Sequence, residues 1–90
     1  MKLLPMRGCP GRFVVADADA RTRSPQDLFG VSDVITCVVP TARDPVLVAR
    51  LPDGRGVISY ARADGTFCHT VGSPEGFARK LDKLGIPMAF

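Results

Sequence analysis

The last part of the chain carries a helical pattern. Apolar residues recur there at the spacing of one helix face: Phe77, Leu81 and Leu84. Ser73 and Pro74 are typical of the first positions of a helix, and Gly85 is typical of the residue after the last turn. The pattern predicts a helix over 74–84, with Ile86 folding back onto the helix end.

Short apolar runs rich in β-branched residues indicate β-strands. They cover 12–17, 34–39, 46–51, 57–62 and 66–71. The run 34–39 is apolar at odd and even positions alike, as expected of a strand covered on both faces, so we expect it to be the central strand. The fold class predicted is α+β: a small antiparallel β-meander or partly closed barrel of about five strands, with a short helical turn and one C-terminal helix.

Proline and glycine separate these elements. Residues 1–11 are dense in both and are expected to form an irregular N-terminal arm. The segment 24–30 begins with Ser-Pro and ends in Gly, which predicts a single helical turn that docks Leu28 and Phe29 on the core. The polar stretch 17–24 is expected to be a solvated loop.

Two turn sequences set the expected register of the last three strands. Asp64-Gly65 is interpreted as a two-residue hairpin turn, because both positions tolerate positive φ. The pairs that follow are Ala63 with Thr66, Arg62 with Phe67, Tyr60 with His69 and Ile58 with Val71. The loop 52–56 is expected to pair Leu51 with Val57 and so to extend the same alternation of faces.

This register predicts one surface of mixed chemistry. The face with small residues is expected to receive the C-terminal helix: Leu47, Ala49, Ala61 and Cys68. The opposite face then gathers basic and aromatic side chains, which are our predicted binding residues: Arg50, Tyr60, Arg62, Phe67 and His69. Such side chains dominate protein interfaces, and aromatic rings also stack on single-stranded nucleic acid. The alternative interpretation places Tyr60 and Phe67 with Val46 and Val48 in the core of a curled sheet, with the arginine stems over its rim.

Composition narrows the class of protein. Ninety residues leave room for one hydrophobic core, so 1–90 is expected to be a single domain. Twelve basic and nine acidic residues give a net charge of +3 that is interspersed along the chain, which is a weak signal for nucleic acid. No apolar window approaches the length of a membrane span and the start does not resemble a signal peptide, so we expect a cytoplasmic protein without membrane contact.

Candidate catalytic and metal-binding groups are few. Cys68 and His69 adjoin, but consecutive side chains of a strand point to opposite faces, which argues against a catalytic pair. The same alternation argues against a zinc site built from the set Cys9, Cys37, Cys68 and His69. Asp17 and Asp19 could share a metal or a proton, and a solvated turn is the simpler interpretation. We therefore expect no catalytic residues, no metal and no cofactor.

The leading hypothesis is a non-enzymatic binding protein. It would be a small adaptor or inhibitor that docks on a larger protein or nucleoprotein partner, of the kind that phages and other mobile elements encode. The alternative is a nucleic-acid-binding β-domain that uses the basic and aromatic face. Self-association is a further expectation, because an uncovered sheet face can pair with its own copy.

Overall fold

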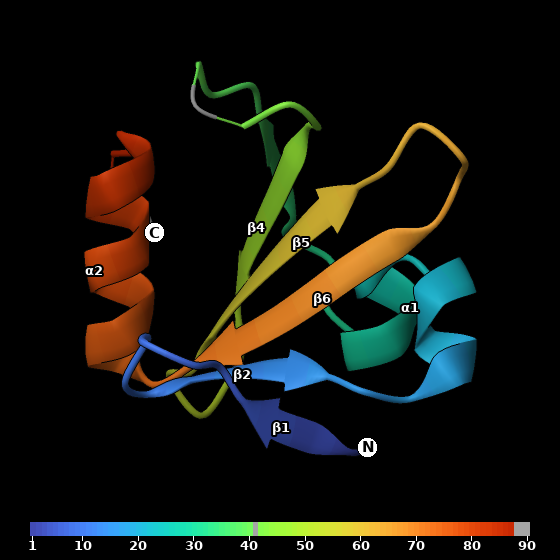
Figure 1. Ribbon diagram of the computed structural model, residues 1–90, viewed down its shortest axis with the longest axis horizontal. Helices are drawn as coiled ribbons and strands as arrows, with labels where there is room; N and C mark the ends of the chain where they lie inside the picture. Colours follow the sequence, from blue (N-terminus) through green and yellow to red (C-terminus); the bar gives the residue numbers. More distant parts are fainter. Residues whose placement is uncertain (41, 88–90) are drawn as a thin grey trace.

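Six antiparallel strands form one open sheet in the computed structural model, which describes residues 1–40 and 42–87 (Figure 1). The strands are β1 (Leu3–Pro5), β2 (Arg12–Val15), β3 (Ile35–Cys37), β4 (Val46–Arg50), β5 (Gly56–Ala61) and β6 (Phe67–Gly72). The helical segments are the 3-10 helix η1 (Ala18–Thr22), α1 (Pro25–Phe29) and α2 (Pro74–Leu84). Across the sheet the order is β1-β2-β6-β5-β4-β3, so the last four strands form a meander. The predicted α+β meander with a helical turn and a C-terminal helix is confirmed.

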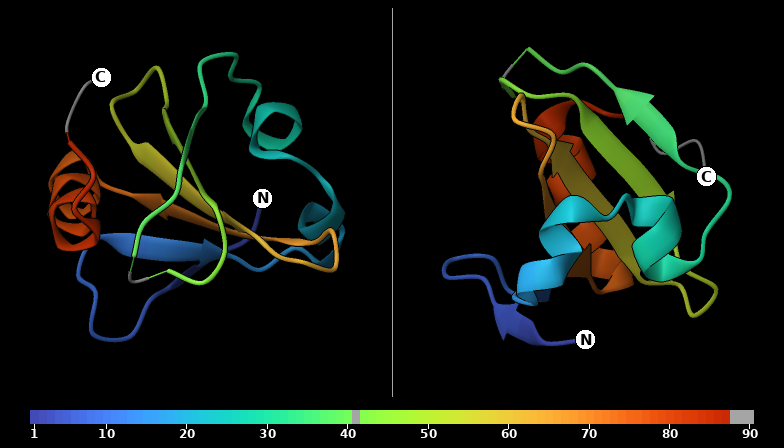
Figure 2. Two further views of the ribbon diagram at one scale, coloured as in Figure 1. Left: turned by 90° about the horizontal axis from the view of Figure 1, so that it is seen from above. Right: turned by 90° about the vertical axis from the view of Figure 1, so that its right-hand side faces the viewer.

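The sheet is covered on both faces, which creates two apolar clusters (Figures 1 and 2). The first lies under α2 and consists of Val39, Val46, Val48, Ile58, Phe77, Leu81 and Ile86. The second lies on the other face, beneath the turn that contains α1, and consists of Ala49, Leu51, Val57 and Val71. Half-buried Phe29 of α1 packs against this second cluster as expected, whereas Leu28, which was expected to dock with it, is half-buried without belonging to the residues packed there. The central strands are therefore buried from both sides.

Both α-helices begin and end as the sequence indicates. The Ser24 side chain accepts a hydrogen bond from the Asp27 amide in α1, and the Ser73 side chain accepts one from the Gly76 amide in α2. At the end of α2, Gly85 is left-handed and the Ile86 amide donates to the Leu81 carbonyl at 2.9 Å. This pattern of bonds is a Schellman motif, and it seats Ile86 in the core beneath the helix.

The N-terminal segment contains regular structure that we expected to be absent. Residues Leu3 to Pro5 pair with β2, with Leu3 opposite Val15 and Pro5 opposite Phe13. Proline is tolerated here because β1 is an edge strand, where a missing amide proton need not break a ladder. The loop 17–24 also differs from expectation, since five of its residues form η1.

The expected central strand is in fact an edge strand. β3 pairs with β4 alone, and the middle of the sheet is occupied by β5 and β6. The segment is apolar at both parities for another reason, which is that it runs between the two clusters. Val34 packs against the cluster on the α1 face, and Val39 belongs to the cluster under α2.

The two tight hairpins of the meander, β4–β5 and β5–β6, have the same loop conformation. In the first, the Leu51 amide donates to Arg55 and the Gly54 amide donates to Leu51; in the second, Arg62 donates to Thr66 and Gly65 donates to Arg62. Each is a three-residue loop that ends in a glycine of positive φ, 93° at Gly54 and 87° at Gly65. This is a turn followed by a bulge, a common solution for hairpins in which glycine takes the left-handed position.

This loop geometry overturns the predicted register between β5 and β6. With three residues in the loop, Tyr60 pairs with Cys68 and Ser59 pairs with His69. The predicted pairing of Tyr60 with His69 was wrong by one residue, and a shift of one residue exchanges the faces of a strand. The register between β4 and β5 differs from the prediction by two residues, because Arg50 pairs with Gly56, and a shift of two leaves the faces unchanged.

The helix also covers the face opposite to the one predicted. α2 lies over Val46, Val48 and Ile58, with half-buried Tyr60 against the same cluster. Gly56 permits this approach, since a Cβ atom at that position would lie 1.9 Å from the Phe77 ring. The Phe77 ring packs on the backbone of Gly56, in place of the expected packing of the helix on small side chains.

Candidate functional site

The five predicted binding residues do not form one surface. Tyr60 lies on the α2 face of the sheet, whereas Phe67 and His69 lie on the η1 face. Arg62 is exposed and follows the end of β5. The physical cause is the one-residue difference in the β5 and β6 register. The predicted basic and aromatic face is therefore corrected to two separate sets of side chains.

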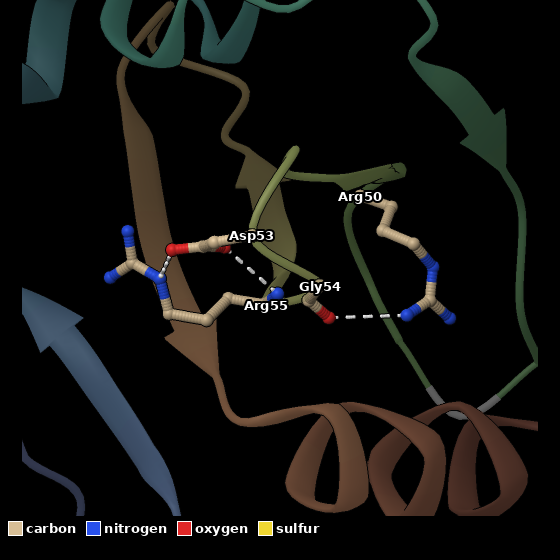
Figure 3. A network of polar contacts seen from close by, with 4 residues as sticks. All are labelled: Arg50, Asp53, Gly54 and Arg55. Carbon is tan, nitrogen blue, oxygen red and sulfur yellow. Dashed lines mark hydrogen bonds and ion pairs between the residues drawn. The ribbon is translucent and has the colours of Figure 1, made fainter.

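Arg50 is used internally. Its guanidinium carbon lies 5.2 Å from the centre of the Phe77 ring, close enough for a cation–π contact. Its Nη1 atom donates a hydrogen bond of 3.1 Å to the Gly54 carbonyl, across the loop that also holds the Asp53–Arg55 ion pair (Figure 3). Arg50 thus ties the first hairpin loop to the helix layer.

His69 is buried in a network of hydrogen bonds. Its Nε2 atom lies 3.0 Å from the Ala20 carbonyl and 2.9 Å from the Arg23 carbonyl, and its Nδ1 atom lies 2.7 Å from Ser59 Oγ. Carbonyl oxygens only accept, so Nε2 carries the proton and Nδ1 accepts from the serine hydroxyl. Burial lowers the pKa of His69, and the two carbonyl contacts oppose this shift.

The aromatic neighbours of His69 complete this buried assembly. The Phe67 ring stacks on the imidazole with centroids 5.4 Å apart, and Phe29 meets it edge-on at 6.0 Å. Although serine and histidine are hydrogen-bonded here, both are buried and the imidazole is fully engaged. The arrangement fastens η1 to the sheet and offers no nucleophile to a substrate.

The structure also shows where the other candidate catalytic and metal-binding residues lie. Cys68 pairs with Tyr60 and so lies on the face opposite His69. A side-chain oxygen of Asp17 accepts a hydrogen bond of 2.8 Å from the Lys2 amide, and Asp19 is exposed in η1. Within residues 1–40 and 42–87, no group of three or more His, Cys, Asp or Glu side chains is arranged to hold a metal ion.

The outer edge of β3 is a candidate interface that sequence reasoning missed. Among the described residues, β3 pairs on one side only, and Figure 2 shows it at the rim of the sheet. Ile35 is 44% exposed and Val38 is 88% exposed. No charged residue occurs in 34–39. The apolar pattern was a usable signal, but it was interpreted as burial in the centre of the sheet.

The opposite edge of the sheet has a different character. β1 ends in Pro5 and is preceded by Lys2, two residue types that discourage edge-to-edge pairing. Leu4 of β1 is 46% exposed, close to the value for Ile35. The two edges therefore offer a matched comparison in which β3 is the edge that carries neither proline nor charge.

Arg12 is a second residue that the sequence did not single out. It begins β2 and is 4% exposed, which is exceptional for arginine. A lone arginine after glycine gives no signal of burial in the sequence.

No helix in the described part of the chain is long and apolar enough to cross a bilayer. The chain matches no protein-family model, no curated protein and no solved structure.

Proposed function

We propose that this chain is a non-enzymatic binding protein that docks on a larger protein by pairing the outer edge of β3 with an extended segment of that partner. The observation that carries the proposal is the exposed, uncharged, apolar edge strand. Unpaired strand edges present free amide and carbonyl groups, and proteins commonly protect such an edge with charge, proline, cover or short length; of these, β3 has only its short length. Addition of a partner's strand is a recurring mode of peptide recognition.

The edge favours a partner segment over a second copy. β3 has three residues, so a symmetric β3 pair would share only a short ladder. A segment of a larger protein can continue beyond the strand and cover Val38 as well. Main-chain hydrogen bonds would supply affinity, while Ile35 and Val38 would favour apolar side chains on the partner.

The alternative of nucleic-acid stacking has lost its support. It required Tyr60 and Phe67 on one open face, and these residues lie on opposite faces of the sheet. The hypothesis of docking on a larger protein does not depend on that face, because another exposed surface is available for it. The β3 edge takes the place of the predicted face.

Lysine substitutions at the edge test the proposal. Ile35→Lys and Val38→Lys should abolish capture of the partner from an extract of the cells that express the protein, because a charge on the pairing strand opposes strand addition. Leu4→Lys is the matched control on the opposite edge and should retain capture. All three positions are exposed, so stability should change by less than about 0.5 kcal/mol.

Hydrogen exchange on the captured complex then locates the interface. Amides of β3 should become protected on binding, whereas those of β1 should not change. Retention of the same partner by both edge variants, or protection confined to other strands, would refute docking at β3. Edge-dependent dimerisation of the purified chain, measured by light scattering, would instead assign the edge to a second copy.

A further inference from the structure

The Arg12 guanidinium is buried with little to neutralise it. Its Nη2 atom donates to the Thr70 hydroxyl, while Nε and Nη1 have no hydrogen-bond partner among residues 1–40 and 42–87. The ion pair found in that part of the chain joins Asp53 and Arg55, so no described carboxylate compensates Arg12. A buried cation without a compensating negative charge is costly, and replacing buried ionic groups by apolar residues is often neutral or stabilising, so the retained arginine calls for an explanation.

The surroundings of Arg12 leave room for its guanidinium group, and the group keeps its positive charge there. Gly72 lies beside the guanidinium, and a Cβ atom there would be 2.9 Å from Nη1. Burial lowers the pKa of Arg12, while the nearby Tyr60 and Cys9 oppose this effect. Arginine nevertheless keeps its proton in proteins, so the site holds a fixed positive charge with unused N–H donors.

A pocket of about 80 Å³ adjoins this charge. Its lining joins the loop before β2 to one side of α2 and consists of Gly8, Cys9, Pro10, Arg12, Arg79, Lys80 and Lys83. The volume is several times the roughly 10–15 Å³ that one water molecule requires. The lining contains four cationic residues and no acidic one, so it favours an anion.

The loop wall of the pocket is held in place by the helix. Arg79 Nη2 donates a hydrogen bond of 3.1 Å to the Pro10 carbonyl, and the Ser73 amide donates to the Gly11 carbonyl at 2.8 Å. Figure 1 shows this loop reaching from the start of β2 towards α2. The two walls of the pocket are thus fixed relative to each other in the folded protein.

A purely structural explanation accounts for part of this cluster only. Lys80 and Lys83 lie in the second half of α2, where positive charge favours the helix dipole. That reasoning does not explain why a third cation, Arg12, lies almost without solvent contact in the same pocket wall. An anionic ligand would satisfy both observations.

We propose that this pocket binds a phosphate monoester in its dianionic form, with Arg12, Arg79, Lys80 and Lys83 as the cationic residues of its lining. Arginine is the residue best suited to hydrogen-bonding phosphate oxygens. Gathering four cations about one small pocket matches a compact dianion better than a chain of singly charged diesters, which calls for an extended basic track. The proposal is independent of docking at β3.

Titration with phenyl phosphate, followed by NMR of the backbone amides, tests the site. Residues 8–12 and 79–83 should shift in a saturable way. The variant Lys80→Ala/Lys83→Ala should bind at least roughly tenfold more weakly, because it removes two charge-assisted contacts. Arg62→Ala is the control for loss of charge, since Arg62 is exposed outside the pocket lining, and should bind as the wild type does. Unchanged affinity in the double lysine variant would refute the assignment.

Arg12 itself is tested by thermal unfolding. Phenyl phosphate should raise the unfolding temperature of the wild type, because a ligand of the native state stabilises it. Arg12→Met should lose that rise and unfold cooperatively without ligand. If Arg12→Met does not fold, Arg12→Lys keeps the test open and should show a weakened rise. A ligand-induced rise that survives either substitution undiminished would refute the role of Arg12.

Different phosphate compounds distinguish a monoester site from a site for phosphodiesters. Inorganic phosphate should compete with phenyl phosphate at the same amides, whereas dimethyl phosphate should not bind measurably. Binding of phenyl phosphate should be tighter at about pH 7.5 than at about pH 5.5, because the second proton of such esters leaves near pH 6. Equal binding of the diester, or tighter binding of single-stranded oligonucleotides with a steep dependence on salt, would overturn the monoester in favour of a nucleic-acid backbone.

Discussion

His69 shows how one side chain joins a strand to the layer that covers it. It was predicted as an exposed member of a binding face, and it is instead buried between η1 and the sheet. Its burial could not be inferred from composition, since the strand pattern leaves the face of each residue open until the register is fixed. Ser59, the Ala20 carbonyl in η1 and the Arg23 carbonyl directly after η1 are the partners that make its burial possible.

The lowered pKa of His69 leads to a defined dependence of stability on pH. The unfolded chain takes up a proton near pH 6.5, whereas the folded chain takes it up only at a lower pH. Stability should therefore be complete above about pH 6.5 and decrease as the pH falls towards the folded pKa, with a slope of at most about 1.4 kcal/mol per pH unit. Urea unfolding between about pH 5 and pH 7 measures this slope.

His69→Asn should flatten that slope, whatever its effect on overall stability. The comparison is clean because His69 is the one histidine of the chain. Arg62→Ala should leave the slope unchanged. A slope that persists in His69→Asn would show that another group is responsible for the loss of stability in this range.

The hairpins show which features of an element the sequence could predict. Helix boundaries followed from local chemistry, because Ser73, Pro74 and Gly85 act at fixed positions relative to α2. The existence of both hairpins also followed from local sequence, the glycine-containing loop 52–56 in the first and Asp64-Gly65 in the second. Their registers did not, since Asp-Gly occurs both in two-residue loops and in longer loops that end in a left-handed glycine. The residue before Asp64 is part of the turn, and that single residue decided which side chains share a face.

Gly56 is the position at which one strand and the helix depend most directly on each other. Gly56→Ala should destabilise the protein by about 1–3 kcal/mol or more, because the new methyl group overlaps the Phe77 ring. Chemical denaturation gives this value. Combining Gly56→Ala with Phe77→Leu should cost less than the sum of the two single changes, since the smaller side chain makes room. Strict additivity would contradict the proposed contact.

At the scale of the whole molecule, strand order determines where stability lies. β5 and β6 have a strand on each side and an apolar or hydrogen-bonded layer on each face, whereas β1 and β3 have a neighbour on one side among the described residues. The sequence could supply β2 to β6 and their antiparallel arrangement, but it missed β1. It could not place β3 at the edge, because an apolar segment that crosses between two clusters has the same composition as a buried strand.

Amide hydrogen exchange on the isolated protein should reproduce this order. The amides of β5 and β6 should exchange most slowly, near the rate set by global unfolding, and those of β3 should exchange much faster through local opening. Equal protection across all six strands would show that the edge strands are held by contacts beyond the sheet described here.

The linear order of the sheet also has a practical consequence. The amino terminus precedes β1, five strand positions away from β3, which corresponds to about 24 Å measured along the sheet at the usual spacing between strands. An affinity tag or fluorophore joined at Met1 would thus leave the outer edge of β3 free to pair with a strand of the partner. A donor fluorophore at Met1 and an acceptor on the partner segment would report, by energy transfer, the distance from Met1 to the labelled end of that segment.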